Sequence, residues 1–207
     1  LSIQEGQFLL SFCNNVSPMF CISYGILYAI GTSNVLPYLF CIYGSALLFG
    51  FFTRPAIPLA TGTKKQTSST ESIFQFIDVC IIDSFTILIK LCAYLILFTI
   101  ISKGLLLFVP ERYLYVAPVI TSILEITGGL SCISKLPLGC IRSVFAIAAM
   151  TFGGLCCIFQ TNSVLADTGL SLKKYIFHKV IITILALFLF FLWNFFHNSS
   201  FTVNCWS

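Results

Sequence analysis

The sequence predicts an all-α, polytopic membrane protein with about five transmembrane helices, including broken helices and a re-entrant helical hairpin. The first observation behind this is composition, because 58% of the 207 residues are apolar and only 9% are charged. The second is that apolar runs of about 18 to 28 residues recur along the chain, and about 20 residues span a bilayer. The third is that polar or glycine pairs interrupt several runs. A helix broken at membrane depth is tolerated only beside protein or water.

The first apolar run, 8–30, is interrupted by Asn14, Asn15, Ser17 and Pro18. Proline removes a backbone donor, clashes with the preceding turn and moves the residue before it away from helical angles. Two interpretations remain open. The run is either a kinked helix whose asparagines bind neighbouring helices, or a discontinuous helix that lines a substrate site.

A turn at 31–34 and a second span at 35–52 follow, and together residues 1–52 form a broken helix plus a transmembrane helix. Residues 53–72 are the one long hydrophilic stretch and predict a flexible cytoplasmic loop. The remaining residues, 73–207, hold the hairpin and the final transmembrane helix.

A long helix is expected over 74–101, and it carries Asp78, Asp83 and Lys90. A charged residue at the centre of a membrane helix costs about 2.5–3.5 kcal/mol and usually faces a bundle interior or a polar cavity. Asp78 is expected to touch water at the interface. Asp83 and Lys90 lie two turns apart on one face, and either a bridged buried pair or an interfacial position remains open for them.

The next apolar run begins near Tyr115 and reaches Glu125, which is followed by Thr127, Gly128 and Gly129. Glycine supplies backbone angles that a helix does not hold, and a threonine hydroxyl can bond to freed carbonyls. A second helix break is therefore expected here. Glu125 is either an intramembrane functional carboxylate or a side chain that reaches the interface.

Two further apolar stretches, 140–152 and 155–165, flank Gly153 and Gly154, and each is too short to cross a bilayer. They predict a re-entrant hairpin whose second arm carries Gln160, Asn162 and Ser163. The competing interpretation is one span of about 26 residues with a glycine pair for close packing. The last helix is expected over 175–196.

The distribution of basic residues favours the hairpin and gives an orientation. If 140–165 re-enters, eight basic residues fall on one side and only Lys103 and Arg112 fall on the other, which places residue 1 in the cytoplasm and the C-terminus outside. If it spans, the counts become five against five. The eight are Arg54, Lys64, Lys65, Lys135, Arg142, Lys173, Lys174 and Lys179.

The ten cysteines lie mostly in apolar runs without a C-x-x-C pair, and we interpret them as small buried hydrophobic residues. No metal or other cofactor is expected. The sequence contains no Ser-His-Asp set, histidine-rich motif or phosphate-binding loop, so an enzyme is not expected. The net charge of +4 comes from short loops and does not indicate nucleic-acid binding.

Three segments resemble the sporulation integral membrane proteins of the YlbJ type, which belong to the Gate or nucleoside recognition domain group. The most specific segment runs from Glu5-Gly6-Gln7 through Ser11-Phe12-Cys13-Asn14-Asn15-Val16-Ser17-Pro18-Met19-Phe20. The second is the helix from Phe76 to Ile101. The third includes Glu125 to Leu130, then Phe152 to Leu155, Gln160 and Ser163 to Leu165.

The resemblance implies that the chain corresponds to the C-terminal half of such a protein, that 73–207 is a Gate-like domain, and that the protein acts in cortex and coat maturation during endospore formation. It implies a multi-pass protein of the bacterial inner or forespore membrane. It supplies no solute and no coupling ion.

Two functions are therefore expected: a transporter-like protein with a polar solute site at the helix breaks, or a non-transporting scaffold of the sporulation machinery. The partners are the lipid bilayer and, for the first function, a small polar solute; a homo-oligomer is compatible with both. The candidate substrate-binding residues share a place at or beside a helix break: Asn14, Asn15, Ser17, Glu125, Thr127, Gln160, Asn162 and Ser163.

Overall fold

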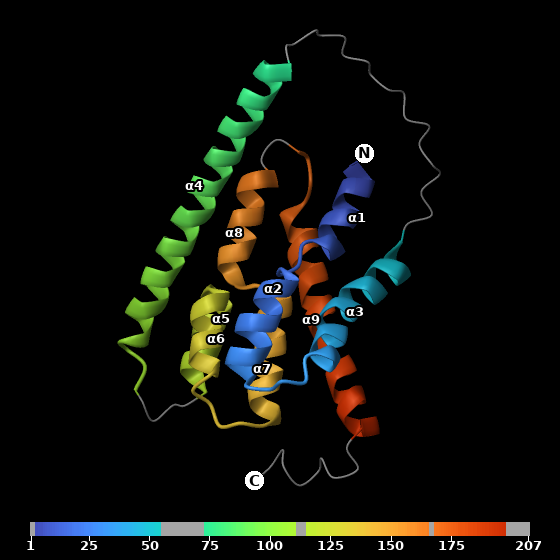
Figure 1. The fold of residues 1–207 in the computed structure, drawn as a ribbon, viewed down its shortest axis with the longest axis vertical. Helices are drawn as coiled ribbons and strands as arrows, with labels where there is room; N and C mark the ends of the chain where they lie inside the picture. The colour runs from blue at the N-terminus through green and yellow to red at the C-terminus, as the bar shows by residue number, and fades with distance from the viewer. Residues whose placement is uncertain (1–2, 55–72, 111–114, 166–167, 198–207) are drawn as a thin grey trace.

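The computed structural model describes residues 3–54, 73–110, 115–165 and 168–197 (Figure 1). Within these ranges the regular structure is helical and contains no strand, which confirms the all-α membrane fold. From residue 55 on, the loop expected over 53–72 lies outside the described residues, and so do Glu111 and Arg112.

The first apolar run forms three helical pieces: α1 (Ile3–Cys13), α2 (Pro18–Phe20) and the π-helix η1 (Cys21–Ile30). The predicted break between α1 and α2 is confirmed. Pro18 occupies the first position of α2, where its missing N–H costs nothing. Gly31 ends η1 with φ +79°, a backbone angle that favours glycine. The next helix, α3 (Leu36–Thr53), is the predicted second span.

A helical hairpin exists, but it lies at a different place from the one that the sequence predicted. Helices α5 (Val116–Leu124) and α6 (Ile126–Ile133) pack side by side and are joined by Glu125 alone (Figure 1). A Cβ atom on Gly129 would lie 2.5 Å from the Ser122 Cα atom, so glycine lets the two arms touch. The break therefore falls at Glu125, and Gly128 and Gly129 continue α6 as helix.

The hairpin expected over 140–165 is wrong. Helices α7 (Cys140–Phe152) and α8 (Gly154–Leu165) follow one another along the long axis of the molecule and do not lie side by side (Figure 1). Gly153 and Gly154 take φ +82° and +76°, so they interrupt the helix without reversing it. The 26 residues fit the competing interpretation of one interrupted span.

Within the described residues, four helical stretches are long and apolar enough to cross a membrane: Leu36–Thr53, Phe76–Leu106, Cys140–Leu165 and Leu172–Phe196. The last belongs to α9 (Leu172–His197), and the second to α4 (Ile73–Leu106). The pieces from Ile3 to Ile30 together follow the same long axis, but the break leaves each piece too short to qualify alone.

The new place of the hairpin changes the charge distribution. Figure 1 shows that α7 starts at the end of the molecule where α4 finishes. Lys103 belongs to the last turn of α4, Arg142 to the first turn of α7, and Lys135 to the connection that precedes α7. Lys173 and Lys174 lie at the opposite end, where α1 begins. The eight-to-two difference assumed the hairpin over 140–165, so it no longer supports the orientation derived from it.

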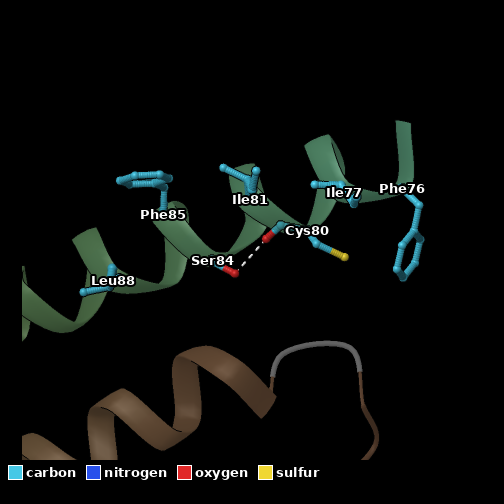
Figure 2. A pocket seen from close by; sticks show the side chains of 7 residues that line it. All are labelled: Phe76, Ile77, Cys80, Ile81, Ser84, Phe85 and Leu88. Atoms are coloured by element: carbon cyan, nitrogen blue, oxygen red, sulfur yellow. Dashed lines mark hydrogen bonds between the residues drawn. The ribbon is translucent and has the colours of Figure 1, made fainter. Parts of the chain in front are cut away.

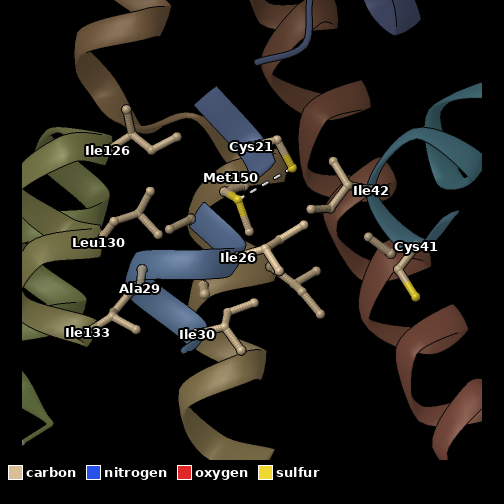
Figure 3. Packing of buried hydrophobic residues seen from close by; sticks show 14 of the residues in the cluster. Cys21, Ile26, Ala29, Ile30, Cys41, Ile42, Ile126, Leu130, Ile133 and Met150 are labelled. Carbon is tan, nitrogen blue, oxygen red and sulfur yellow. Dashed lines mark hydrogen bonds between the residues drawn. The ribbon is translucent and has the colours of Figure 1, made fainter. Parts of the chain in front are cut away.

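The hydrophobic core lies in the half of the molecule that contains η1, α6 and α7 (Figure 3). Ile26, Leu130 and Ile147 are fully buried at its centre. Gly25 lies so close to Met150 that a Cβ atom there would meet the Met150 sulfur at 2.1 Å. This close packing holds the α5–α6 hairpin and η1 against α7. It thereby sets the positions of these helices along one another.

Helix α4 is the least buried of the four candidate spans, and the side chains of its first half are exposed from Phe76 on. An open apolar pocket of about 310 Å³ follows one face of it, with Phe76, Phe85 and Leu88 among its lining residues (Figure 2). Asp78, Asp83 and Lys90 are all exposed. Of the two alternatives for Asp83 and Lys90, a buried pair within this chain is therefore wrong.

The cysteine side chains divide by environment. Cys21, Cys41 and Cys156 are buried, as expected, but Cys13, Cys80 and Cys92 are exposed. The expectation of burial fails for Cys80 and Cys92 because α4 is mostly exposed, and for Cys13 because it ends α1 at the helix break.

Candidate functional site

Three helix interruptions meet at one level, near half the height of the molecule (Figure 1). They are the break between α1 and α2, the turn at Glu125, and the glycine pair between α7 and α8. Each leaves a helix C-terminus with free carbonyls beside a helix N-terminus with free N–H groups. The candidate site is built from the side chains that satisfy these ends.

Several carbonyl groups at the end of α1 and in the break that follows it have partners. Asn15 donates its side-chain amide to the Phe12 carbonyl at 2.6 Å and its backbone N–H to the Cys13 carbonyl at 3.0 Å. The Tyr43 hydroxyl donates to the Val16 carbonyl at 2.8 Å. On the other side of the break, Ser17 caps α2 by accepting from the Phe20 N–H at 3.3 Å.

Lys179, from α9, supplies the strongest donor at this break. Its side chain is only 3% exposed. The Nζ atom donates to the Asn14 carbonyl and, at 3.2 Å, to the Asn15 Oδ1 atom. It also lies 5.9 Å from the centre of the Tyr175 ring, a cation–π distance. A buried ammonium thus stands at the C-terminal end of α1, where the helix dipole favours positive charge.

The Asn14 side chain contacts both α8 and α9. Its Nδ2 atom donates to Thr161 Oγ1 at 3.0 Å and to the Tyr175 hydroxyl at 2.9 Å. The break therefore lies next to the helix that follows Gly153 and Gly154. We expected this contact, although the partner is Thr161 rather than Gln160, Asn162 or Ser163.

A pocket of about 410 Å³ opens beside this contact, between α1, α4 and α8. Asn14, Gln160 and Thr161 give it polar groups, and Leu10, Leu91 and Val164 are among its apolar lining residues. The Gln160 Nε2 atom donates to the Cys156 sulfur at 3.3 Å and to the Leu91 carbonyl at 3.5 Å. We call this the solute pocket.

Glu125 is buried, with 1% of its surface exposed, and its carboxylate caps α6. Oε1 accepts from the Thr127 N–H at 2.7 Å, and Oε2 accepts from the Gly128 N–H at 2.7 Å and from the Thr127 hydroxyl at 2.6 Å. The Thr127 hydroxyl thus bonds to the carboxylate and not to a freed carbonyl. A negative charge at a helix N-terminus is favoured by the helix dipole.

The third interruption presses α8 against the end of α5. A Cβ atom on Gly154 would lie 3.0–3.3 Å from the carbonyl oxygens of Ser122, Ile123 and Leu124. The amino end of α8 therefore faces the carboxyl end of α5, an arrangement of opposite partial charges. Both the positive φ and the lack of space require glycine here.

Arg142 is a second buried basic residue at a helix C-terminus, here that of η1. It is buried, and its guanidinium donates to the carbonyls of Ala29 at 2.6 Å, Leu136 at 3.2 Å and Tyr28 at 3.4 Å. Two of these carbonyls belong to the last turn of η1. Lys179, Glu125 and Arg142 are thus three buried charges, and each stands at a helix end of opposite partial charge.

The structure brings only part of the predicted set together. Asn14 and Gln160 line the solute pocket, whereas Asn15 and Ser17 stabilise the break beside it. Glu125 and Thr127 form their own cap at the hairpin. Asn162 is exposed, and the Ser163 hydroxyl donates to the Gln160 carbonyl in its own helix at 2.8 Å.

Sequence analysis missed three residues of the site: Lys179, Tyr175 and Thr161. Lys179 was counted only as a charge that flanks the last helix, because two exposed lysines precede it. Its spacing from Tyr175, four residues, puts both on one helix face and is the signal that could have found them.

A scan of protein-family models and searches of curated proteins and of solved structures found no match to this chain. The fold itself defines the class as an all-α membrane protein.

Proposed function

We propose that this chain belongs to a transporter-like integral membrane protein that binds a small polar solute where its helix interruptions meet. The observation that carries the proposal is the solute pocket. Asn14 Oδ1 and Gln160 Oε1 both accept no hydrogen bond from the described residues, although their amide nitrogens are engaged. Two hydrogen-bond acceptors therefore remain for a ligand.

The remaining chemistry of the pocket indicates the kind of solute. Free carbonyl oxygens bind N–H or O–H donors. The walls are otherwise apolar, with Leu10, Leu91 and Val164 around the two amides. A solute with donors on one edge and an apolar body fits these groups, in keeping with sites that use few polar contacts for orientation.

The resemblance to sporulation integral membrane proteins supports a cellular process and a membrane in which this activity takes place. We propose that the protein acts in endospore formation, in the inner or forespore membrane. Five crossings are proposed: Ile3 to Ile30 as one broken span, together with α3, α4, the interrupted α7–α8 span and α9. The α5–α6 hairpin would enter and leave on one side.

The alternative function is a non-transporting scaffold, and the Glu125 cap favours it. Three hydrogen bonds from its own helix N-terminus occupy that carboxylate. A carboxylate so engaged stabilises the hairpin and has little capacity left for a proton or a coupling cation.

Complementation of a spore-forming strain that lacks the gene separates the two functions. Gln160→Leu removes one acceptor from the pocket, and Asn162→Leu makes the same change on an exposed position two residues away. The transporter proposal predicts few heat-resistant spores with Gln160→Leu and normal numbers with Asn162→Leu, at equal protein levels. Normal spores with both variants would favour the scaffold.

A further inference from the structure

A second pocket, of about 470 Å³, lies between α1, α3 and the beginning of α9. It shares no lining residue with the solute pocket. Phe8 and Phe49 form apolar walls, and Lys174 and His178 bring basic groups. It lies at the end of the molecule where α1 starts, which is also the end of Arg54 and Lys173 (Figure 1).

The His178 imidazole meets the buried Ser11 hydroxyl, whose oxygen lies 2.6 Å from Nδ1. The same hydroxyl lies 2.7 Å from the Gln7 carbonyl, and the histidine tautomer decides which of the two it donates to. In the tautomer to which Ser11 donates at Nδ1, the neutral ring carries its proton on Nε2. The Nε2 atom has no bond to a described residue and can then donate to a ligand.

Gln7 fixes the start of α9 at this pocket. Its Oε1 atom accepts from the Ser171 N–H at 2.6 Å, and its Nε2 atom donates to the Ser171 carbonyl at 3.2 Å. The 26-residue helix α9 therefore presents its positive end here, with Lys174 in its first turn. Glu5, the acidic residue of α1, is not among the lining residues.

We propose that this pocket binds a phosphate group, held by Lys174 and His178 at the start of α9. A lysine ammonium, an imidazole donor and a helix N-terminus together are the chemistry that recognises phosphate. The two phenylalanine walls suit the apolar chain that a phospholipid would add. The same chemistry would also bind free inorganic phosphate, and the experiment distinguishes these sources.

The experiment measures the melting temperature of the purified protein in a neutral detergent. It is titrated with inorganic phosphate, with short-chain phosphatidylglycerol and with short-chain phosphatidylcholine, whose headgroup has no net charge. Lys174→Gln removes the pocket's lysine, and Lys173→Gln removes an exposed neighbour outside the pocket. One charge-assisted hydrogen bond contributes about 1.5 kcal/mol. Lys174→Gln should therefore raise about tenfold the concentration of the phosphate compound that gives half of the maximal stabilisation.

The outcomes decide between the sources and test the site. Stabilisation by phosphate and by phosphatidylglycerol, both weakened in Lys174→Gln, identifies the phosphate group itself as sufficient. Stabilisation by phosphatidylglycerol alone identifies a lipid headgroup. Lys174→Arg, which keeps the charge, should behave like the unchanged protein. The site is overturned if no phosphate compound stabilises the unchanged protein, or if Lys173→Gln weakens the effect as much as Lys174→Gln.

Discussion

The Lys179 ammonium donates to the Asn14 carbonyl across two helices that are far apart in the sequence. This bond joins the end of α1 to the first third of α9 and leaves the Asn14 side chain to contact Thr161 and Tyr175. Lys179 is therefore a positioning residue for the solute pocket. It acts through Asn14 and does not itself line that pocket.

Lys179→Met should destabilise the protein by about 1–3 kcal/mol, because two oxygens at the break lose their charged donor. Thermal unfolding in detergent measures the change, at about 2–4 °C for each kcal/mol in a chain of this size. Lys173→Met is the matched control, since Lys173 is exposed on the same helix. Equal melting temperatures for both variants would contradict the role of Lys179.

Glu125→Gln should also lower stability by about 1–3 kcal/mol, because a side-chain amide cannot accept all three hydrogen bonds and lacks the charge that the α6 N-terminus favours. Thr127→Val removes only the hydroxyl bond and should cost less, about 0.5–1.5 kcal/mol. Melting temperatures in detergent check both values. A larger loss for Thr127→Val than for Glu125→Gln would argue against the cap.

Gly154→Ala should disrupt the junction of α7, α8 and α5. The new methyl would lie about 3.0 Å from the Ser122 carbonyl oxygen, at a φ of +76° that L-residues rarely adopt. Gly104→Ala is the control, because nothing lies within 4 Å of that position in α4, and alanine favours helix by about 1 kcal/mol. Gly154→Ala should lower the expression level and the melting temperature of the protein, whereas Gly104→Ala should leave both unchanged or raise them.

Labelling of single cysteines tests which ends of the helices share a side of the membrane. Lys135→Cys and Lys173→Cys should react with an impermeant thiol reagent from opposite sides, because α7 and α8 together cross between them. The sequence had placed both on one side. Labelling of both from the same side would restore the hairpin over 140–165.

The helices and their interruptions could be predicted because their causes are local. Pro18 cannot continue a helix, and Gly153 and Gly154 adopt angles that other residues avoid. Whether an interrupted helix turns back or continues depends on what packs beside it. Ser122 and Gly129 allow the chain to reverse at Glu125, whereas α8 is directed onward by its contact with the end of α5.

The site could be predicted only in part for the same reason. Asn14 and Gln160 stand out as polar residues in apolar runs, and both line the pocket. Lys179 and Thr161 acquire their roles through contacts across 165 and 147 positions of sequence. The four-residue spacing of Tyr175 and Lys179 marks a shared helix face, but it does not show which distant segment that face contacts. Glu125 looked like a binding carboxylate, but its hydrogen bonds are made within its own turn.

The most direct test of the central claim is whether water reaches the solute pocket within the membrane. In a background without native cysteines, Gln160→Cys is placed in the pocket and Ile184→Cys on the exposed apolar face of α9. A solute site predicts that a water-soluble, charged thiol reagent modifies Gln160→Cys in membranes and leaves Ile184→Cys unmodified. Failure of Gln160→Cys to react from either side would contradict the solute site and leave the scaffold as the function.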